Sequence, residues 1–261
     1  MLKTDSDRDW EWYGAREPYF GVLTNPRFLR ADLTDRARAE FFESGERYVE
    51  SLLDTIGRHV GSVAADARVL DFGCGVGRLA IPFARRFAEV VGVDVAPSML
   101  EEARRNCTAA GLKNVALVPG DDRLSRVTGS FDFVHSFIVF QHVPVARGEA
   151  ITQRILELLR ADGIGALHFT YRTEAGRVRH LSNWLQARTP GLRRVVNVIR
   201  RRDPGTAVMQ MNEYSLSRLM HILHDAGCDE VCARAVRHGD ETGVRAHGVM
   251  LIFRKRKLPE L

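Results

Sequence analysis

From Ala67 onward the sequence alternates between short β-rich runs and helical patterns, and this alternation restricts the fold more than any other feature. The β-rich runs are ARVLDF (67–72), AEVVGVDV (88–95), NVALVP (114–119), FDFVHSF (131–137) and GIGALHFTYR (163–172). Helical patterns lie between them at 76–87, 97–110 and 146–160. Strand–helix alternation at this spacing predicts a parallel sheet with helices on both faces.

The two ends of the chain break the alternation in different ways. Residues 215–228 form an amphipathic helical pattern, and two β-rich runs at 228–236 and 247–255 follow with only a loop between them. Such a connection predicts an antiparallel pair at the edge of the sheet. Residues 1–66 are mostly helical in pattern and include an aromatic-rich stretch broken by glycine and proline. We therefore expect seven strands in a domain that covers 67–261, with a helical cap formed by 1–66.

The turn after the first run is the glycine-rich stretch VLDFGCGVGRLA. Its glycines stand at 73, 75 and 77, and Arg78 occupies the place of the third glycine in a dinucleotide-binding fingerprint. Asp71 precedes the first glycine by two residues, and its carboxylate would repel a pyrophosphate but attract an amino group. Asp94, at the end of the second run, can accept hydrogen bonds from a ribose in either case. A cofactor with a cationic amine and no phosphate fits both the glycine spacing and the carboxylate of Asp71. These two features therefore indicate S-adenosylmethionine rather than NAD.

Four motifs, in order, carry a family resemblance. VLDFGCGVGRLA, VVGVDVAPSMLEEARRN (90–106), GDD (120–122) and FDFVHSFIVFQHVP (131–144) resemble the motifs of class I S-adenosylmethionine-dependent methyltransferases. The resemblance is strong over 67–172 and moderate over 207–257. It implies a Rossmann-like sheet with an antiparallel C-terminal edge pair, a methyltransferase activity, and S-adenosyl-L-methionine as the cofactor.

The resemblance also implies roles for individual residues. The glycines of the loop would let the backbone approach the methionine moiety, and Asp71 would orient its amine. Asp94 would bind the ribose, and Met99 would pack near the adenine unless it is an ordinary core methionine. Asp121 would accept from the adenine amino group, with Asp122 as the alternative because the doublet leaves the register open. Together with Ser136 and Phe137 at the reactive end, the expected cofactor-binding set is Asp71, Gly73, Gly75, Gly77, Asp94, Met99, Asp121, Asp122, Ser136 and Phe137.

A hydroxyl acceptor must also lose its proton, and a histidine suits the role of base. His142 follows the fourth run, where the family faces its substrate, and is the expected catalytic residue; the alternative is a histidine that only hydrogen-bonds the backbone. The other histidines considered are His135, His168, His238 and His247. His168 lies inside a run, which favours a core position.

The residues that follow the fourth and fifth runs narrow the reaction. The fourth run is not followed by [D/N]-P-P-[Y/F], typical of amino-group methylation in this family, or by the Pro-Cys nucleophile of cytosine C5 methylation. Ser136, Phe137, Thr170 and Tyr171 offer no acidic or amide ligands, so no metal is expected. We predict metal-independent SN2 transfer to a small-molecule hydroxyl, on a sugar, a glycan or a secondary metabolite. The alternatives are N-methylation of a small molecule and a catalytically silent cofactor-binding interaction module.

Positive charge is concentrated in one segment. From Arg172 to Arg202 the chain has nine arginines and one acidic residue, Glu174, so this segment carries +8 in a chain of net charge +5. We interpret 173–206 as an arginine-rich helical insert that joins the cap. Its basic face is either solvated, or binds an anionic or glycan-linked substrate, or contacts a membrane surface through 192–202. Nucleic acid is disfavoured because the densest part, LRRVVNVIRRR, lacks aromatic residues for base stacking.

Substrate contacts are expected from two further groups of residues: the aromatic N-terminal stretch, which also contains Trp10 and Phe20, and the histidines that flank the last loop. The substrate residues expected are Trp12, Tyr13, Tyr19, His238 and His247. The alternative for the aromatic residues is a cap that packs on the sheet.

The cysteine spacing and the hydropathy pattern concern the cellular compartment. The four cysteines show no disulfide framework and no paired zinc spacing. No apolar run is long enough for a spanning helix or a signal peptide. We therefore expect a soluble, cytoplasmic protein.

Overall fold

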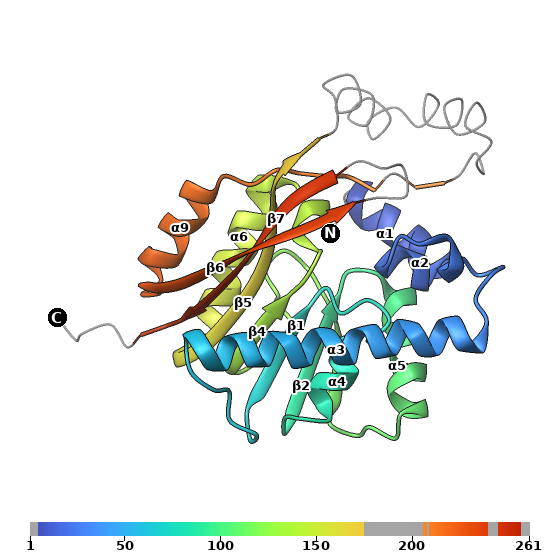
Figure 1. Cartoon of the computed structure of the whole chain (residues 1–261), viewed down its shortest axis with the longest axis horizontal. Coiled ribbons are helices and arrows are strands. Elements are labelled where there is room, and N and C mark those ends of the chain that lie inside the picture. The colour runs from blue at the N-terminus through green and yellow to red at the C-terminus, as the bar shows by residue number, and fades with distance from the viewer. Residues whose placement is uncertain (1–4, 175–205, 208, 240–244, 257–261) are drawn as a thin grey trace.

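The computed structural model describes residues 5–174, 206–207, 209–239 and 245–256, and at its centre is a seven-stranded sheet (Figure 1). The strands lie in the order β3-β2-β1-β4-β5-β7-β6. Their bounds are β1 Arg68–Phe72, β2 Glu89–Asp94, β3 Val115–Pro119, β4 Phe131–Ser136, β5 Leu159–Thr173, β6 Glu230–Gly239 and β7 Arg245–Arg254. Each strand expected from the sequence is present.

The pairing of the strands confirms the expected fold class. Strands β1 to β5 pair in parallel, β1 with both β2 and β4, β2 with β3, and β4 with β5. Strand β7 runs antiparallel between β5 and β6. The sheet is therefore Rossmann-like and mostly parallel, with an antiparallel C-terminal pair. Its order reverses between β1 and β4, and sheets of this kind bind ligands in the crevice at the carboxyl ends of the strands beside that point.

Helices and 3-10 turns precede β1 and lie between most of the consecutive strands that the structure describes. Their bounds are α1 Asp5–Arg16, α2 Pro18–Val22, η1 Pro26–Phe28, α3 Asp35–His59, α4 Ala80–Ala84, α5 Pro97–Ala109, η2 Phe140–His142, α6 Val145–Leu158 and α9 Leu216–Asp225. These helices cover both faces of the sheet (Figure 1).

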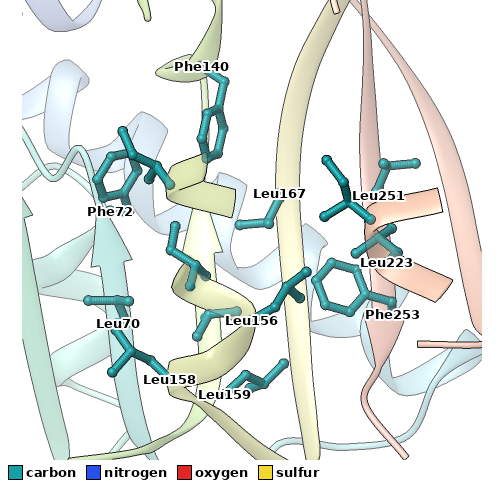
Figure 2. Close-up of a cluster of buried hydrophobic side chains, with 14 of the residues drawn as sticks. Leu70, Phe72, Phe140, Leu156, Leu158, Leu159, Leu167, Leu223, Leu251 and Phe253 are labelled. Carbon is teal, nitrogen blue, oxygen red and sulfur yellow. The ribbon is translucent and has the colours of Figure 1, made fainter. Parts of the chain in front are cut away.

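Alternate side chains of the central strands point to opposite faces, so each face has its own core. On one face, Leu70 and Phe72 of β1 belong to a cluster that includes Leu156 of α6 and Leu223 of α9 (Figure 2). On the other face, Val69 belongs to a cluster with residues of α3 and α4. The sheet is therefore the middle layer between two sets of helices.

Helix α3 forms part of the second layer. It begins after Thr34, whose side chain accepts a hydrogen bond from the Ala37 backbone N–H at 3.1 Å. Its apolar stripe, which includes Val49, Leu52 and Ile56, is buried against the sheet. Much of the expected cap segment is thus packed on the face of the sheet, while α1 and α2 lie near its carboxyl end, with α1 against α5 (Figure 1).

The helix after the glycine-rich loop is shorter than the expected 76–87 and covers Ala80–Ala84 only. Gly75 and Gly77 have φ values of 51° and 87°, in the left-handed region, so the chain makes turns here before a helix can begin. The arginine-rich insert lies almost entirely outside the described residues. Within the described ranges, no helix is both long enough and apolar enough to cross a bilayer.

Candidate functional site

A pocket opens at the carboxyl ends of β1, β2 and β4, beside the reversal of strand order. It encloses about 840 Å³ of space, part of it open to solvent. The lining residues come from helices, from the carboxyl ends of strands and from the loops that follow them. They are Ser6, Asp7 and Trp10 of α1, Gly21 and Val22 of α2, Phe72 of β1, Gly73 and Gly75 after it, Val93 and Asp94 of β2, Val95 after it, Met99 of α5, Gly120, Asp121 and Asp122 after β3, Phe137, Ile138, Val139, His142 and Val143 after β4, and Arg147 and Ile151 of α6. Segments distant in sequence thus meet around one cavity.

The glycine-rich loop forms one wall of the pocket. The backbone N–H groups of Gly73 and Cys74 donate to the Val93 carbonyl at 2.7 and 3.0 Å, which ties the loop to β2. Gly73 has a φ of 77°, and a Cβ there would lie 2.3 Å from a methyl carbon of Val139. Gly77 differs from Gly73, because its α carbon faces Ala103 and Cys107 of α5 rather than the pocket. Two of the three predicted loop glycines therefore line the cavity, and the third faces α5.

Asp94 ends β2 at the edge of the pocket. Its carboxylate accepts hydrogen bonds from the backbone N–H groups of Gly75 and Ala96, both at 2.9 Å. Burial raises the pKa of Asp94 to about 6, and these two backbone donors oppose the rise. The carboxylate oxygens keep further lone pairs, so the residue is suited to accept from hydroxyl groups of a ligand.

The two aspartates that follow β3 both line the pocket, but they have different partners. Asp121 Oδ1 accepts from the backbone N–H groups of Arg123 and Ser125 at 2.9 and 3.1 Å, and the Ser125 hydroxyl bonds its other oxygen. These bonds, the Ser125 side-chain bond first, lower the pKa of Asp121. Asp122 instead receives the Arg147 guanidinium, with Nε 3.0 Å from both carboxylate oxygens. The carboxylate of Asp121 therefore stabilises its own turn, and that of Asp122 is bound to α6.

Helix α1 forms one wall of the pocket, and Arg147 binds this helix to the rest of the domain. Besides Asp122, Arg147 donates to Asp7 Oδ1 at 3.1 Å and lies 3.4 Å from the Ser6 hydroxyl. Trp10 lies edge-on to His142 with ring centroids 4.8 Å apart. The sequence indicated an aromatic cover in this region, but it gave no sign that Ser6, Asp7 and Arg147 meet, because these contacts join residues about 140 positions apart.

His142 lines the pocket next to Trp10. Its Nδ1 lies 2.7 Å from the Gln210 carbonyl oxygen and therefore donates to it. Its Nε2 lies 3.1 Å from the Gln141 amide nitrogen, while Gln141 Oε1 accepts from the Thr170 hydroxyl at 2.8 Å. This orientation of Gln141 makes its amide group a donor to Nε2. The lone pair that a base would use thus faces an amide that must move aside.

Ile138 lines the same wall and has a φ of 58°. A β-branched residue in the left-handed region is strained by about 1–3 kcal/mol, and such strain is concentrated at binding and catalytic sites. Nothing in the sequence pattern indicates this conformation.

Several predicted residues lie away from the pocket wall. Ser136 is fully buried at the end of β4, and Asp71 is buried beneath the glycine-rich loop, 2% exposed. Asp71 Oδ1 lies 2.9 Å from Nδ1 of His135, a contact the sequence did not suggest. The predicted site residues that do line the pocket are Gly73, Gly75, Asp94, Met99, Asp121, Asp122, Phe137 and His142.

The predicted substrate residues have partners elsewhere. The Tyr19 hydroxyl donates to Glu102 at 2.7 Å, and the Tyr13 hydroxyl donates to the Ala207 carbonyl at 3.0 Å. Trp12 packs edge-on against Tyr13, and His247 Nε2 lies 2.9 Å from Glu174. None of these four lines the cavity formed by the described residues. His238 pairs with Ala246 in the β6–β7 ladder, and its side chain is outside the described part of the chain.

The described residues also bear on metal binding. Among them, no group of three or more His, Cys, Asp or Glu side chains is placed to hold a metal ion. The carboxylates that line the pocket are bound to backbone amides or to Arg147.

Comparison with known proteins shows that part of the chain is similar to methyltransferases. Residues 69–163 match a family model described as a methyltransferase domain. The ubiquinone biosynthesis O-methyltransferase of Xanthomonas axonopodis pv. citri (strain 306) is 35% identical over 112 residues, 42% of this chain and 46% of that protein. The 23S rRNA (uracil(1939)-C(5))-methyltransferase of Shewanella sediminis (strain HAW-EB3) is 45% identical over 60 residues, 23% of this chain and 14% of that protein. The chain thus spans less than half the length of these relatives.

A solved structure extends the likeness over the whole chain. The N-methyltransferase NodS from Bradyrhizobium japonicum WM9, in complex with S-adenosyl-L-homocysteine, matches with a TM-score of 0.58 at 14% identity, covering 98% of this chain and 100% of that one. At such low identity the likeness shows the fold alone. The sheet order and the structural match show a Rossmann-like methyltransferase fold. Residues 69–163 are thus similar to a methyltransferase domain, as the sequence predicted.

Proposed function

We propose that the protein is a metal-independent methyltransferase that uses S-adenosyl-L-methionine to methylate a small-molecule hydroxyl. The observation that carries this proposal is the pocket itself, which combines loop glycines, the Asp94 carboxylate and His142 at the carboxyl end of the sheet. The comparisons support transfer of a methyl group in general. Their named acceptors are oxygen, nitrogen and carbon, so the choice of a hydroxyl rests on the residues after β4.

The residues present fit this cofactor. Gly73 and Gly75 keep the loop free of side chains where the methionine moiety would approach, since a Cβ on either would collide with a valine methyl at 2.3 or 2.7 Å. Asp94 would accept from the ribose hydroxyls, and Met99 would pack by the adenine. Asp121 would accept from the adenine amino group, with Asp122 as the alternative, because both line the pocket and each carboxylate already takes three hydrogen bonds.

The bound cofactor supplies an electrophilic methyl group on a sulfonium, and the protein supplies alignment and exclusion of water. Trp10 and α1 cover part of the pocket and would exclude water from that part. His142 would take the hydroxyl proton on Nε2, while its Nδ1–H stays bonded to the Gln210 carbonyl and would stabilise the imidazolium that forms. For this transfer the Gln141 amide must be displaced from Nε2 by the acceptor hydroxyl.

The acceptor we favour is a sugar, a glycan-linked compound or an aromatic secondary metabolite. The aromatic edge of Trp10 and the apolar side chains of Val22, Ile138 and Val139 suit a ring-shaped acceptor. The arginine-rich insert supports an acceptor that carries negative charge, because its +8 is local to one segment of the chain. N-methylation of a small molecule is the second candidate, since the same pocket would align an amine.

Isothermal titration calorimetry with S-adenosyl-L-homocysteine and with NAD tests the proposal. We expect binding of the homocysteine product and none of NAD. Binding of NAD alone would overturn the proposal. Transfer of a labelled methyl group onto pools of sugars, glycolipids and phenolic compounds, followed by mass spectrometry of the product, then distinguishes O- from N-methylation.

A further inference from the structure

A chain of three buried side chains lies beneath the glycine-rich loop, and the proposed chemistry leaves two of them without a role. The Tyr48 hydroxyl lies 3.0 Å from Nε2 of His135, and Nδ1 of the same ring lies 2.9 Å from Oδ1 of Asp71. The three residues come from α3, β4 and β1, which pack together at this point. The His135 ring is fully buried, and the Asp71 side chain is 3% exposed.

The direction of both hydrogen bonds follows when Asp71 is ionised and the His135 ring is neutral. A carboxylate can only accept, so Nδ1 of a neutral His135 donates to Asp71. Nε2 then accepts, and Tyr48 is the donor. Burial raises the pKa of the Tyr48 hydroxyl above its usual value, so this group keeps its proton and remains a donor. The hydrogen-bonded chain from Tyr48 through His135 to Asp71 therefore holds Oδ1 of Asp71 in one orientation.

The other oxygen of Asp71 is left for a partner outside the described chain. Oδ2 is buried and makes no hydrogen bond with the described residues. A buried acceptor without a partner costs about 1–3 kcal/mol, and native proteins keep few of them. Asp71 lies one residue before Phe72 and two before Gly73, both of which line the pocket, and its charge acts on Asp94.

Other charged groups face the same cluster. Arg78 comes from the loop that precedes α4, its guanidinium lies 5.9 Å from the Tyr48 ring centre, and its buried Nε has no partner among the described residues. Arg234 of β6 bonds Thr55 on α3 and acts on Tyr48 only through its charge. Neither arginine makes a hydrogen bond to Asp71 in the described structure, so Oδ2 stays available for a cation.

We propose that Tyr48 and His135 are positioning residues, which hold Asp71 so that Oδ2 binds the α-ammonium group of the methyl donor, directly or through one water. This inference rests on the proposed function and deepens it. A fixed orientation of the carboxylate matters here because an ammonium ion makes short, directional hydrogen bonds to a buried carboxylate. The ring of Tyr48 also packs on Phe137 of the pocket wall, with centroids 4.3 Å apart, so the hydroxyl can be removed while the ring is kept.

The test uses Tyr48→Phe in the full chain and three ligands: S-adenosyl-L-homocysteine, its deamino analogue and its decarboxy analogue. We expect Tyr48→Phe to weaken the two ligands that keep the amine by about tenfold. The deamino analogue should bind both proteins equally, because it lacks the group that Asp71 receives. His135→Gln should give the same pattern.

Thr55→Val is the matched control, since it also removes a buried hydroxyl from α3, nearly two turns further along. It should leave all three affinities unchanged. Equal weakening of all three ligands by Tyr48→Phe, or no weakening of any, would overturn the positioning role while leaving the proposed function intact. A wild-type protein that binds none of the three would overturn both.

Discussion

Asp94 is placed where two requirements conflict. Ligand binding needs an ionised carboxylate, whereas burial favours the protonated form and raises the pKa of Asp94 to about 6. Two backbone N–H donors offset part of this penalty. A carboxylate held in this way is ready to bind a ligand at neutral pH but is close to losing its charge.

We expect affinity for S-adenosyl-L-homocysteine to fall as the pH drops through about 6, because protonated Asp94 loses an acceptor for the ribose hydroxyls. The loss should reach about tenfold at pH 5 relative to pH 7.5, which calorimetry at several pH values measures. The stability of the free protein should show the opposite sign. Since folding raises this pKa, the stabilising contribution is present at low pH and is lost as the pH rises through about 6. Asp94→Asn should be weak but flat in affinity across this range; a wild-type curve equally flat would contradict the assignment.

His142 has both ring nitrogens hydrogen-bonded, which leaves two readings of its role. If it is the base, His142→Ala should lower kcat by about a hundredfold or more with little change in cofactor affinity. Single-turnover kinetics with the acceptor identified by the labelled screen measures this. An unchanged kcat would assign His142 to the wall of the pocket, as a ring that orients Gln141 and supports Trp10.

At the scale of elements, the glycine-rich loop matters because its backbone at Gly73 lies close against the side chain of Val139. Gly73→Ala should cost more stability than the strain of a positive φ alone, because the new Cβ would meet Val139 at 2.3 Å. Gly111→Ala is the control, since Gly111 has a φ of 71° and nothing within 4 Å of an added Cβ. Urea unfolding of both variants isolates the contribution of close approach. Equal losses would mean that Val139 moves away at no cost.

Helix α1 is fastened to the domain at Arg147, and its attachment can be tested separately. Arg147→Met should speed hydrogen exchange of the α1 amides by about five- to thirtyfold, a loss of one to two kcal/mol, because Asp7 loses its guanidinium partner. Arg58→Met removes an i,i+4 pair with Asp54 in which both side chains are 63% exposed, and it should leave α1 unchanged. Unchanged exchange in Arg147→Met would show that aromatic packing alone holds the helix.

These elements differ in how far the sequence could predict them. The strands and the loop glycines were predictable because apolar runs and turn residues act over a few positions. The short α4 was not, because the left-handed Gly75 and Gly77 delay the helix in a way that periodicity does not record. The contacts of Arg147 with Asp7, and of His135 with Asp71, join residues 140 and 64 positions apart, and only the folded chain brings them together.

At the scale of the whole molecule, charge is distributed unevenly. The segment from Arg172 to Arg202 carries +8, so the rest of the chain carries −3 to give the net +5. Replacing Arg200, Arg201 and Arg202 together by glutamine should raise KM for an anionic acceptor, and added salt should reduce the difference between variant and wild type. The same replacements should leave the affinity for S-adenosyl-L-homocysteine unchanged. A KM that does not change would identify the segment as a solvated surface.

The place of β7 has a consequence for how the chain is made. This strand comes last among the described elements, yet it lies between β5 and β6 (Figure 1). During synthesis, β5 leaves the ribosome with a long row of unpaired backbone groups, and its neighbour is translated only after more than seventy further residues. An exposed strand edge of this kind invites pairing with other chains. The nascent protein is therefore most open to aggregation, and most in need of chaperone protection, until β7 has inserted and closed the sheet.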